Sequence, residues 1–135
     1  PLNPPTMASI FTQIVNGDIP AHKVAETRDF LAFLDVRPVS PGHTLVIPKQ
    51  EIDYFLDLDD ETYIGLNLFA REVANLLQSA YPDKRIATAI IGLDVPHAHM
   101  HLIPISSMAD MDFSKAQEAD QETLKAELEK IRSQR

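Results

Sequence analysis

The stretch His97-Ala98-His99-Met100-His101-Leu102-Ile103 places three of the chain's five histidines at every second position, with apolar residues between and after them. Because alternate side chains of a strand point to the same face, we expect a strand over 97–103 with all three imidazoles on one side. Ala98, Met100 and Leu102 then point the other way, into a core. Adjacent imidazoles disfavour one another's protonation and stay neutral near pH 7, which suits a nucleophile, a proton carrier or a metal ligand. A solvated histidine-rich strand is the structural alternative, and the apolar residues between the histidines argue against it.

Length and composition indicate one globular domain. The chain has 135 residues, 44% of them hydrophobic, and its lack of cysteine excludes disulfides, cysteine-ligated zinc and a cysteine nucleophile. No apolar run is long enough to cross a membrane, and no charged-then-apolar leader precedes Met7, so we expect a cytoplasmic protein with no membrane partner. Residues 1–6 are expected to be a tag or a disordered tail. The net charge of −8 argues against DNA or RNA as a partner, because polymer binding rests on phosphate neutralisation, but it leaves room for a small nucleotide.

Hydrophobic periodicity and turn residues predict three helices and five strands. The strands are expected at 23–27, 30–35, 43–47, 84–91 and 97–103. A short helix is expected over 8–15, and a long one from an Asp59 N-cap to Pro82, with a last helix starting near Asp120. The long helix carries an apolar stripe at helical spacing, formed by Leu66, Phe69, Ala70, Val73, Leu76, Leu77 and Ala80. The order predicts an α+β domain, with a five-stranded antiparallel meander sheet, a long central helix and N- and C-terminal helices.

The histidine stretch resembles the signature of the histidine-triad (HIT) nucleotide hydrolases and transferases, His-φ-His-φ-His-φ-φ with φ apolar, at all seven positions. The likeness covers roughly 8–105 and continues upstream in Ile10-Phe11 with Ile14, Gly17-Asp18-Ile19-Pro20-Ala21, Ala32-Phe33-Leu34-Asp35 and Pro41-Gly42-His43-Thr44-Leu45-Val46-Ile47-Pro48-Lys49. It implies a HIT domain over 7–112 followed by a C-terminal helical extension over 113–135. It also implies the homodimer common in this family. The apolar stripe of the long helix is compatible with a dimer interface, but a stripe that faces the core explains the same pattern.

The resemblance implies a specific chemistry at the histidines. His99, the middle one, attacks the α-phosphorus of a purine nucleoside phosphoramidate or phosphoanhydride and forms a nucleotidyl-histidine intermediate, without a cofactor. His101 donates a hydrogen bond, and a proton, to the phosphate or the leaving group. His97 and His43 orient the nucleophile or carry protons.

The resemblance also assigns a site for an AMP-like nucleotide. An apolar clamp on the base maps onto Ile10, Phe11, Ile14, Phe33 and Val36. From spacing alone, plain core packing is the better explanation of these apolar positions. Asp35 falls where the family binds the ribose hydroxyls, and a turn residue at the end of a strand is an equally good explanation of it.

The segment before the triad departs from the family. The family commonly has Gly-Gln-Ser or Gly-Gln-Thr there, whereas this chain reads Gly92-Leu93-Asp94-Val95-Pro96. Leu93 cannot donate a hydrogen bond, and an ionised Asp94 repels an α-phosphate or else receives a cationic leaving amine. The usual asparagine upstream is missing, and Ile105 replaces the arginine that often follows the triad. Phosphate charge is then expected to rest on His101 and the backbone N–H groups near Gly92, with weak or redirected activity.

Two other classes of function stay open at this point. Some family members bind a structural zinc through Cys-x-x-Cys and a later histidine. This chain has Ser9, Thr12 and Glu51 at those places, so we expect neither that zinc nor another metal. A metalloenzyme is the first alternative, in which the three triad histidines and the Asp94 carboxylate are the four metal ligands. Three ligands from one short strand would, however, crowd a tetrahedral site. The second is a non-catalytic nucleotide-binding or scaffold protein on the same fold.

Overall fold

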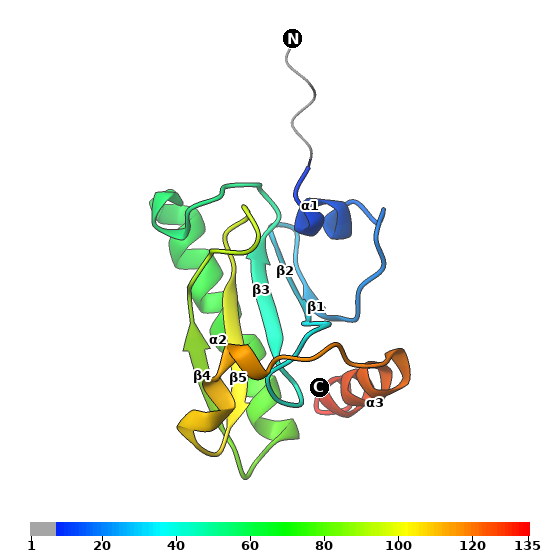
Figure 1. Cartoon of the computed structure of the whole chain (residues 1–135). Helices are drawn as coiled ribbons and strands as arrows, with labels where there is room; N and C mark the ends of the chain where they lie inside the picture. The colour runs from blue at the N-terminus through cyan, green and yellow to red at the C-terminus, as the bar shows by residue number, and fades with distance from the viewer. Residues whose placement is uncertain (1–7) are drawn as a thin grey trace.

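A five-stranded antiparallel sheet organises the fold (Figure 1). The computed structural model describes residues 8–135, so the predicted tail over 1–6 and start at Met7 lie outside the described residues. The strands are β1 Lys23–Glu26, β2 Phe30–Leu34, β3 Thr44–Pro48, β4 Arg85–Ala89 and β5 Met100–Ile105. The helices are α1 Ile10–Val15, α2 Asp60–Ala80 and α3 Gln121–Arg132, with short 3-10 helices at Phe55–Asp57, Met108–Met111 and Phe113–Lys115. This arrangement confirms the predicted α+β class.

The strand order differs from the simple meander that the sequence analysis expected. The order across the sheet is β1-β2-β3-β5-β4, so β5 lies between β3 and β4. The chain leaves β3, passes through α2 and reaches the edge of the sheet at β4, and then turns back into the gap. His101 is thereby paired with Leu45 of β3 on one side and with Ala89 of β4 on the other.

The strand that carries the histidines starts later than predicted. β5 begins at Met100 rather than at His97 and continues through Pro104 to Ile105. Its partner β3 ends at Pro48. The residues just before β5 are held instead by a hydrogen bond outside the sheet, from the Ala98 N–H to the Ile52 carbonyl at 2.7 Å. The alternation of faces nevertheless holds, because Ala98, Met100 and Leu102 are buried in the core as predicted.

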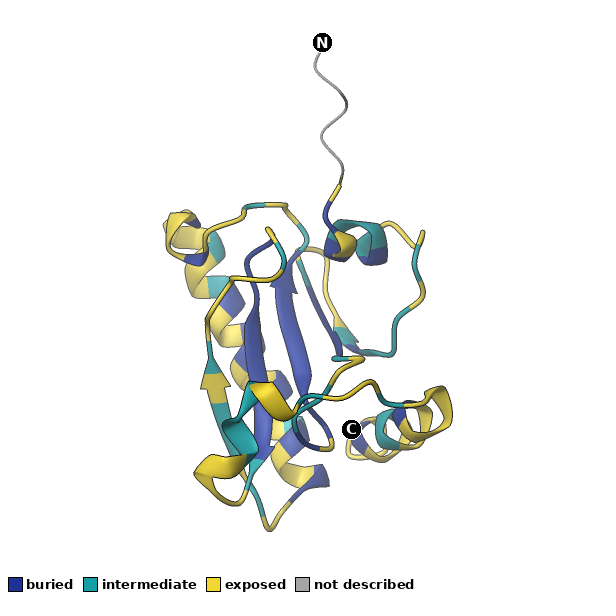
Figure 2. Cartoon of the chain, in the orientation of Figure 1, coloured by how far each residue is buried: buried dark blue, intermediate teal, exposed yellow. Residues whose placement is uncertain are grey.

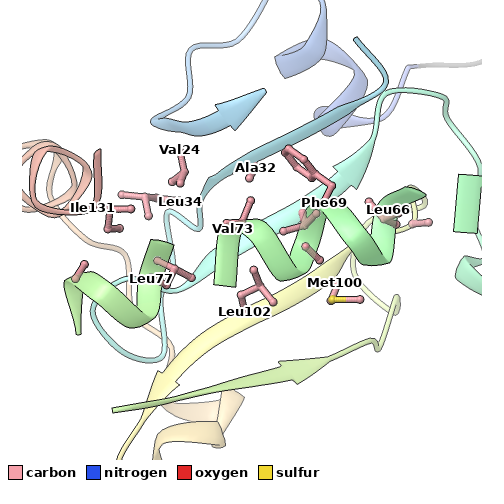
Figure 3. Packing of buried hydrophobic residues seen from close by; sticks show 14 of the residues in the cluster. Val24, Ala32, Leu34, Leu66, Phe69, Val73, Leu77, Met100, Leu102 and Ile131 are labelled. Carbon is pink, nitrogen blue, oxygen red and sulfur yellow. The ribbon is translucent and has the colours of Figure 1, made fainter. Parts of the chain in front are cut away.

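The main core lies between the sheet and α2 (Figure 3). Asp59 caps α2 by accepting a hydrogen bond from the Thr62 N–H, and the predicted apolar stripe then faces the sheet. The sheet contributes Ala32, Leu34, Val46, Met100 and Leu102, and α3 adds Leu124 and Ile131. The stripe therefore belongs to the core, and α3 packs against that same core. The predicted boundary between a domain over 7–112 and an extension over 113–135 stays a prediction.

The other face of the sheet is only partly covered. α1 packs on it through Phe11 and Ile14, against Leu31, Phe33, Leu45 and Ile47. α1 lies near one end of this face, and β3 and β5 are the most completely buried strands (Figure 2). The histidines project from this incompletely covered face. Among the helices of residues 8–135, none is both long and apolar enough to cross a membrane.

Candidate active site

His99 and His101 line a pocket of about 440 Å³ on the face that carries α1. Its other lining residues come from α1, the loop after β2, β3, the loop before the triad and the segment after β5: Ile10, Phe11, Asp35, Val36, Arg37, Leu45, Asp94, Val95, Phe113 and Ala116. Five separate parts of the chain therefore meet at two of the three triad histidines.

Hydrogen bonding fixes the tautomer of His99. Its Nδ1 lies 2.8 Å from the carbonyl oxygen of His97. A carbonyl oxygen only accepts hydrogen bonds, so the neutral His99 ring carries its hydrogen on Nδ1. The lone pair of Nε2 is then free, which is the state that a nucleophilic imidazole needs.

The same reasoning fixes the hydrogens of His43 and His101. The Val39 N–H donates to Nδ1 of His43 at 3.1 Å, so neutral His43 carries its hydrogen on Nε2. That Nε2 lies 2.9 Å from Nδ1 of His101 and donates to it. His101 must then hold its own hydrogen on Nε2, as a donor.

Burial keeps both of these rings neutral. Burial, with smaller contributions from the neighbouring His101 and His99, lowers the pKa of His43 to about 3. Burial and, to a smaller extent, His99 lower the pKa of His101 to about 4, an effect that Asp94 partly opposes. At neutral pH both rings are therefore uncharged. His43 accepts from the Val39 amide and donates to His101, which keeps its own N–H donor, on Nε2, for the pocket.

His97 lies behind the pocket rather than in it. Its ring is fully buried, with Nδ1 2.8 Å from Ser9 Oγ and Nε2 2.8 Å from the Pro48 carbonyl oxygen. Burial lowers the pKa of His97, so it too is neutral. Because both ring nitrogens are used, the three triad rings do not converge on a common ligand, which counts against the alternative of a metal held by the triad and Asp94.

A different group of residues has the spacing of a metal site. Asp35, His43 and His101 each offer a ligand atom, and these atoms lie within 4.8 Å of one another. His43 Nε2 must keep its hydrogen, however, because Nδ1 accepts from the Val39 amide. A protonated ring nitrogen has no lone pair for a metal, so the geometry favours a hydrogen-bonded cluster here.

The structure separates the predicted base clamp into two parts. Ile10 and Val36 are 49% and 51% exposed and line the pocket, with Phe11 beside them. The Phe11 ring packs edge-on against Phe33 and His99, at centroid distances of 5.4 and 5.2 Å. Phe33 and Ile14 are buried behind Phe11 and do not line the pocket. Core packing therefore explains Phe33 and Ile14, but it does not explain the exposed side chains of Ile10 and Val36.

Asp35 serves the turn and also lines the pocket. Its Oδ1 accepts from the Arg37 N–H at 2.9 Å, and Oδ2 lies 3.5 Å from His43 Nε2. Burial raises the pKa of Asp35, an effect opposed mainly by the Arg37 hydrogen bond. The two explanations drawn from the sequence are therefore compatible.

The loop before the triad is divided between two cavities. Asp94 lines the histidine pocket. Gly92, predicted to bind nucleotide, instead lines a neighbouring cavity of about 510 Å³, together with Tyr54, Leu56, Ile90, Ile91 and Ala98 among others. His99 belongs to both cavities. Leu93 is 87% exposed and lines neither of them.

The sequence analysis did not assign five of the lining residues to the site: Arg37, Leu45, Val95, Phe113 and Ala116. Among residues 8–135, Arg37 is the only lysine or arginine lining the pocket, and its Nη2 donates to the Ala116 carbonyl at 3.2 Å. Phe113 packs edge-on against His101 and His43, at centroid distances of 5.0 and 6.0 Å. The one available signal was that Phe113 is the only aromatic residue after Tyr81.

Comparison with known proteins relates the chain to one family, both by sequence and by structure. The family model described as the HIT domain matches residues 16–108. An adenosine 5'-monophosphoramidase of Schizosaccharomyces pombe is 41% identical over 106 residues, which cover 73% of this chain and 74% of that protein. Among solved structures, a Hit-like protein from Bartonella henselae has a TM-score of 0.81 at 30% identity, covering 94% of this chain and 96% of its own. A Zn-bound histidine triad family protein from Mycobacterium smegmatis has a TM-score of 0.79 at 29% identity, covering 95% and 93%. The match extends over most of the domain as well as over the triad, and the chain belongs to the HIT family.

Proposed function

We propose that this protein is a nucleotide phosphoramidase or nucleotidyl transferase acting at the α-phosphate of a purine nucleotide, with His99 as the nucleophile. The observation that carries the proposal is the hydrogen bond from His99 Nδ1 to the His97 carbonyl, which leaves the Nε2 lone pair free. The name of the S. pombe relative supports a phosphoramidate of adenosine as the substrate.

The reaction proceeds in two displacements. His99 Nε2 forms a bond to the α-phosphorus as the bond from phosphorus to the leaving group breaks, and the leaving group takes up a proton from protonated His101. Water or another acceptor then attacks the phosphorus, His99 leaves with its electron pair, and the proton that the acceptor loses returns to His101. His101 donates from Nε2 to the phosphate or the leaving group, and the negative phosphate favours its protonated form.

The base and ribose bind on the α1 side of the pocket. Ile10, Phe11 and Val36 hold the base between apolar side chains, and Asp35 accepts from the ribose hydroxyls through Oδ2. Arg37 is close enough to the pocket to offset part of the negative charge of the ligand. It stands in for cationic and hydrogen-bonding groups that the family usually places near the triad.

A substrate panel with detection of the covalent intermediate tests this function. Adenosine and guanosine phosphoramidates, dinucleoside polyphosphates and nucleotidyl sulfates are assayed for release of the monophosphate. Intact mass measured after alkaline quenching detects a nucleotidyl adduct, and peptide mapping assigns it to His99. AMP binding with neither adduct nor turnover across the panel would instead identify a non-catalytic nucleotide-binding protein.

Asp35→Ala is expected to weaken binding of a ribonucleotide more than that of its 2′,3′-dideoxy analogue. The lost charge-assisted hydrogen bonds are worth about 2–4 kcal/mol together. Calorimetric titration of both ligands measures the difference. Damage to the turn at Arg37 affects both ligands equally and cancels, so an equal loss for the two would rule out the ribose contact.

Asp94→Ser is expected to tighten AMP binding about two- to tenfold and to raise phosphoramidase activity. The change removes a carboxylate that repels the phosphate and adds a hydroxyl donor. Added salt screens the repulsion, so the gain should shrink as ionic strength rises. Asp53→Ser is the matched control, because exposed Asp53 lines the neighbouring cavity. A collapse of activity in Asp94→Ser would instead assign Asp94 a positive role, such as receiving a leaving amine.

We also propose that the protein forms a homodimer in the cytoplasm. β4 is an edge strand with an unpaired side, and the face of α2 away from the core exposes Tyr63, Ile64 and Leu68. An open strand edge next to exposed apolar side chains suits pairing with a second copy.

A further inference from the structure

Glu51 and the start of α1 meet at the buried ring of His97. Ser9, the N-cap of α1, lies next to His97, and Thr12 lies one turn further along the helix. One carboxylate oxygen of Glu51 accepts from the Ser9 N–H at 2.8 Å and from the Thr12 hydroxyl at 2.6 Å. These hydrogen bonds, first from Thr12 and then from Ser9, lower the pKa of Glu51, so its carboxylate is ionised at neutral pH.

The direction of each hydrogen bond follows from the chemistry of its partners. His97 Nε2 faces the Pro48 carbonyl and must donate, so Nδ1 has a lone pair and accepts. Ser9 Oγ, at 2.8 Å, is the donor to Nδ1. The Thr12 hydroxyl gives its hydrogen to Glu51, so at 3.3 Å from Nδ1 it is not a competing donor. The Pro48 carbonyl therefore fixes the tautomer of His97, and Ser9, itself next to Thr12 and Glu51, holds the ring in place through Nδ1.

The position of His97 depends on contacts of its ring, because its backbone is not paired in the sheet. It precedes β5, and its own N–H donates to Val95 within the loop. Its ring is held between Ser9 of α1 and Pro48 of β3, and its carbonyl receives the His99 Nδ1–H. A shift of the His97 ring would move the acceptor that fixes the His99 tautomer.

We propose that Ser9, Thr12 and Glu51 form a positioning brace that sets the His97 carbonyl and, through it, the catalytic imidazole of His99. The proposal rests on the proposed function of His99 as nucleophile. None of the three brace residues lines the histidine pocket, so they act through His97 and not on the substrate.

The brace occupies the place where the resemblance puts zinc ligands in other family members. The residues present do not fit a zinc ion. The Ser9 and Thr12 hydroxyls are neutral, and each already donates a hydrogen bond, Ser9 to His97 and Thr12 to Glu51. Zinc sites of this kind use thiolates and imidazoles. In this chain a hydrogen-bonded carboxylate therefore stands where other family members bind a structural zinc.

Ser9→Ala tests the brace, because it removes the donor to His97. We expect kcat to fall about three- to tenfold, the equivalent of one lost hydrogen bond, with KM changed less than about twofold. In nucleotide-free protein the ring ¹⁵N signals of His99 should shift toward a mixture of tautomers, and the Nδ1 signal of His97 should shift because it loses its hydrogen bond. Ser9→Thr retains a hydroxyl and should restore both properties.

Controls separate the brace from helix stability and from the proposed function. Asp59→Ala removes the N-cap of α2 at a comparable cost in stability, and should leave kcat and the histidine signals unchanged. Glu51→Gln weakens the brace without touching the cap hydroxyl, and should give a smaller effect of the same kind. Wild-type kcat and unchanged ring signals in both Ser9→Ala and Glu51→Gln would overturn the brace. A wild-type protein without turnover would overturn the proposed function, and the ring signals would still decide the brace.

Discussion

His99→Ala should reduce turnover at least about a thousandfold, while AMP affinity stays within about tenfold of wild type. The substitution removes the only proposed nucleophile, so the covalent intermediate cannot form. The groups proposed to bind base and ribose lie on α1 and on the loop after β2 and are retained, although Phe11 loses its contact with the His99 ring. Steady-state assays with an adenosine phosphoramidate measure turnover, and calorimetry measures AMP binding.

His22→Ala is the matched control for His99→Ala. His22 lies outside the pocket, and its ring contacts Gln121 at the start of α3. It should therefore retain wild-type turnover. Equal activity of His99→Ala and His22→Ala would refute the nucleophile assignment, and loss of AMP binding in His99→Ala would show that the ring also holds the ligand.

Gly42→Ala should lower the free energy of unfolding by about 2–5 kcal/mol. Gly42 has a φ of +87°, where a side chain costs about 1–2 kcal/mol. A Cβ there would also lie 2.6 Å from Tyr81 Cε2 and 3.1 Å from Pro104 Cγ, and overpacking costs about 1–3 kcal/mol more. Chemical denaturation measures the change, and thermal melting should show a drop of about 10–20 °C.

Gly17→Ala separates backbone strain from overpacking. Gly17 has a similar φ of +83°, but a Cβ there would meet no atom within 4 Å. It should cost only about 1–2 kcal/mol. If the two variants are equally stable, the contact with Tyr81 contributes nothing, and the ring can move aside.

Local patterns in the sequence predicted the faces and ends of elements well. The two-residue period placed Ala98, Met100 and Leu102 in the core, and it did so even where the strand itself had not begun. Asp59 and Asp120 cap α2 and α3 because short carboxylates before a helix accept from its first N–H groups. These features depend on neighbours within a few residues, which a sequence displays directly.

Features set by distant partners could not be predicted in the same way. Periodicity shows which face a side chain takes, but not which strand lies beside it, so the position of β5 was missed. Ile10 and Ile14 have the same side chain on one short helix, yet only Ile10 reaches the pocket. Phe113 reaches His43 from 70 positions away, through a segment with no apolar period. The roles of the site residues remain predictions.

The late entry of β5 has a consequence for how the protein folds. Until residues 100–105 insert, β3 has an open edge and β4 has no neighbouring strand in the sheet. Bringing β5 back to β3 closes a long loop, an entropic cost that is repaid only when the strand pairs on both sides. The histidines arrive with this strand, so a chain that has formed only its first hairpin and α2 holds no assembled triad. Assembly of the proposed catalytic group therefore coincides with closure of the sheet.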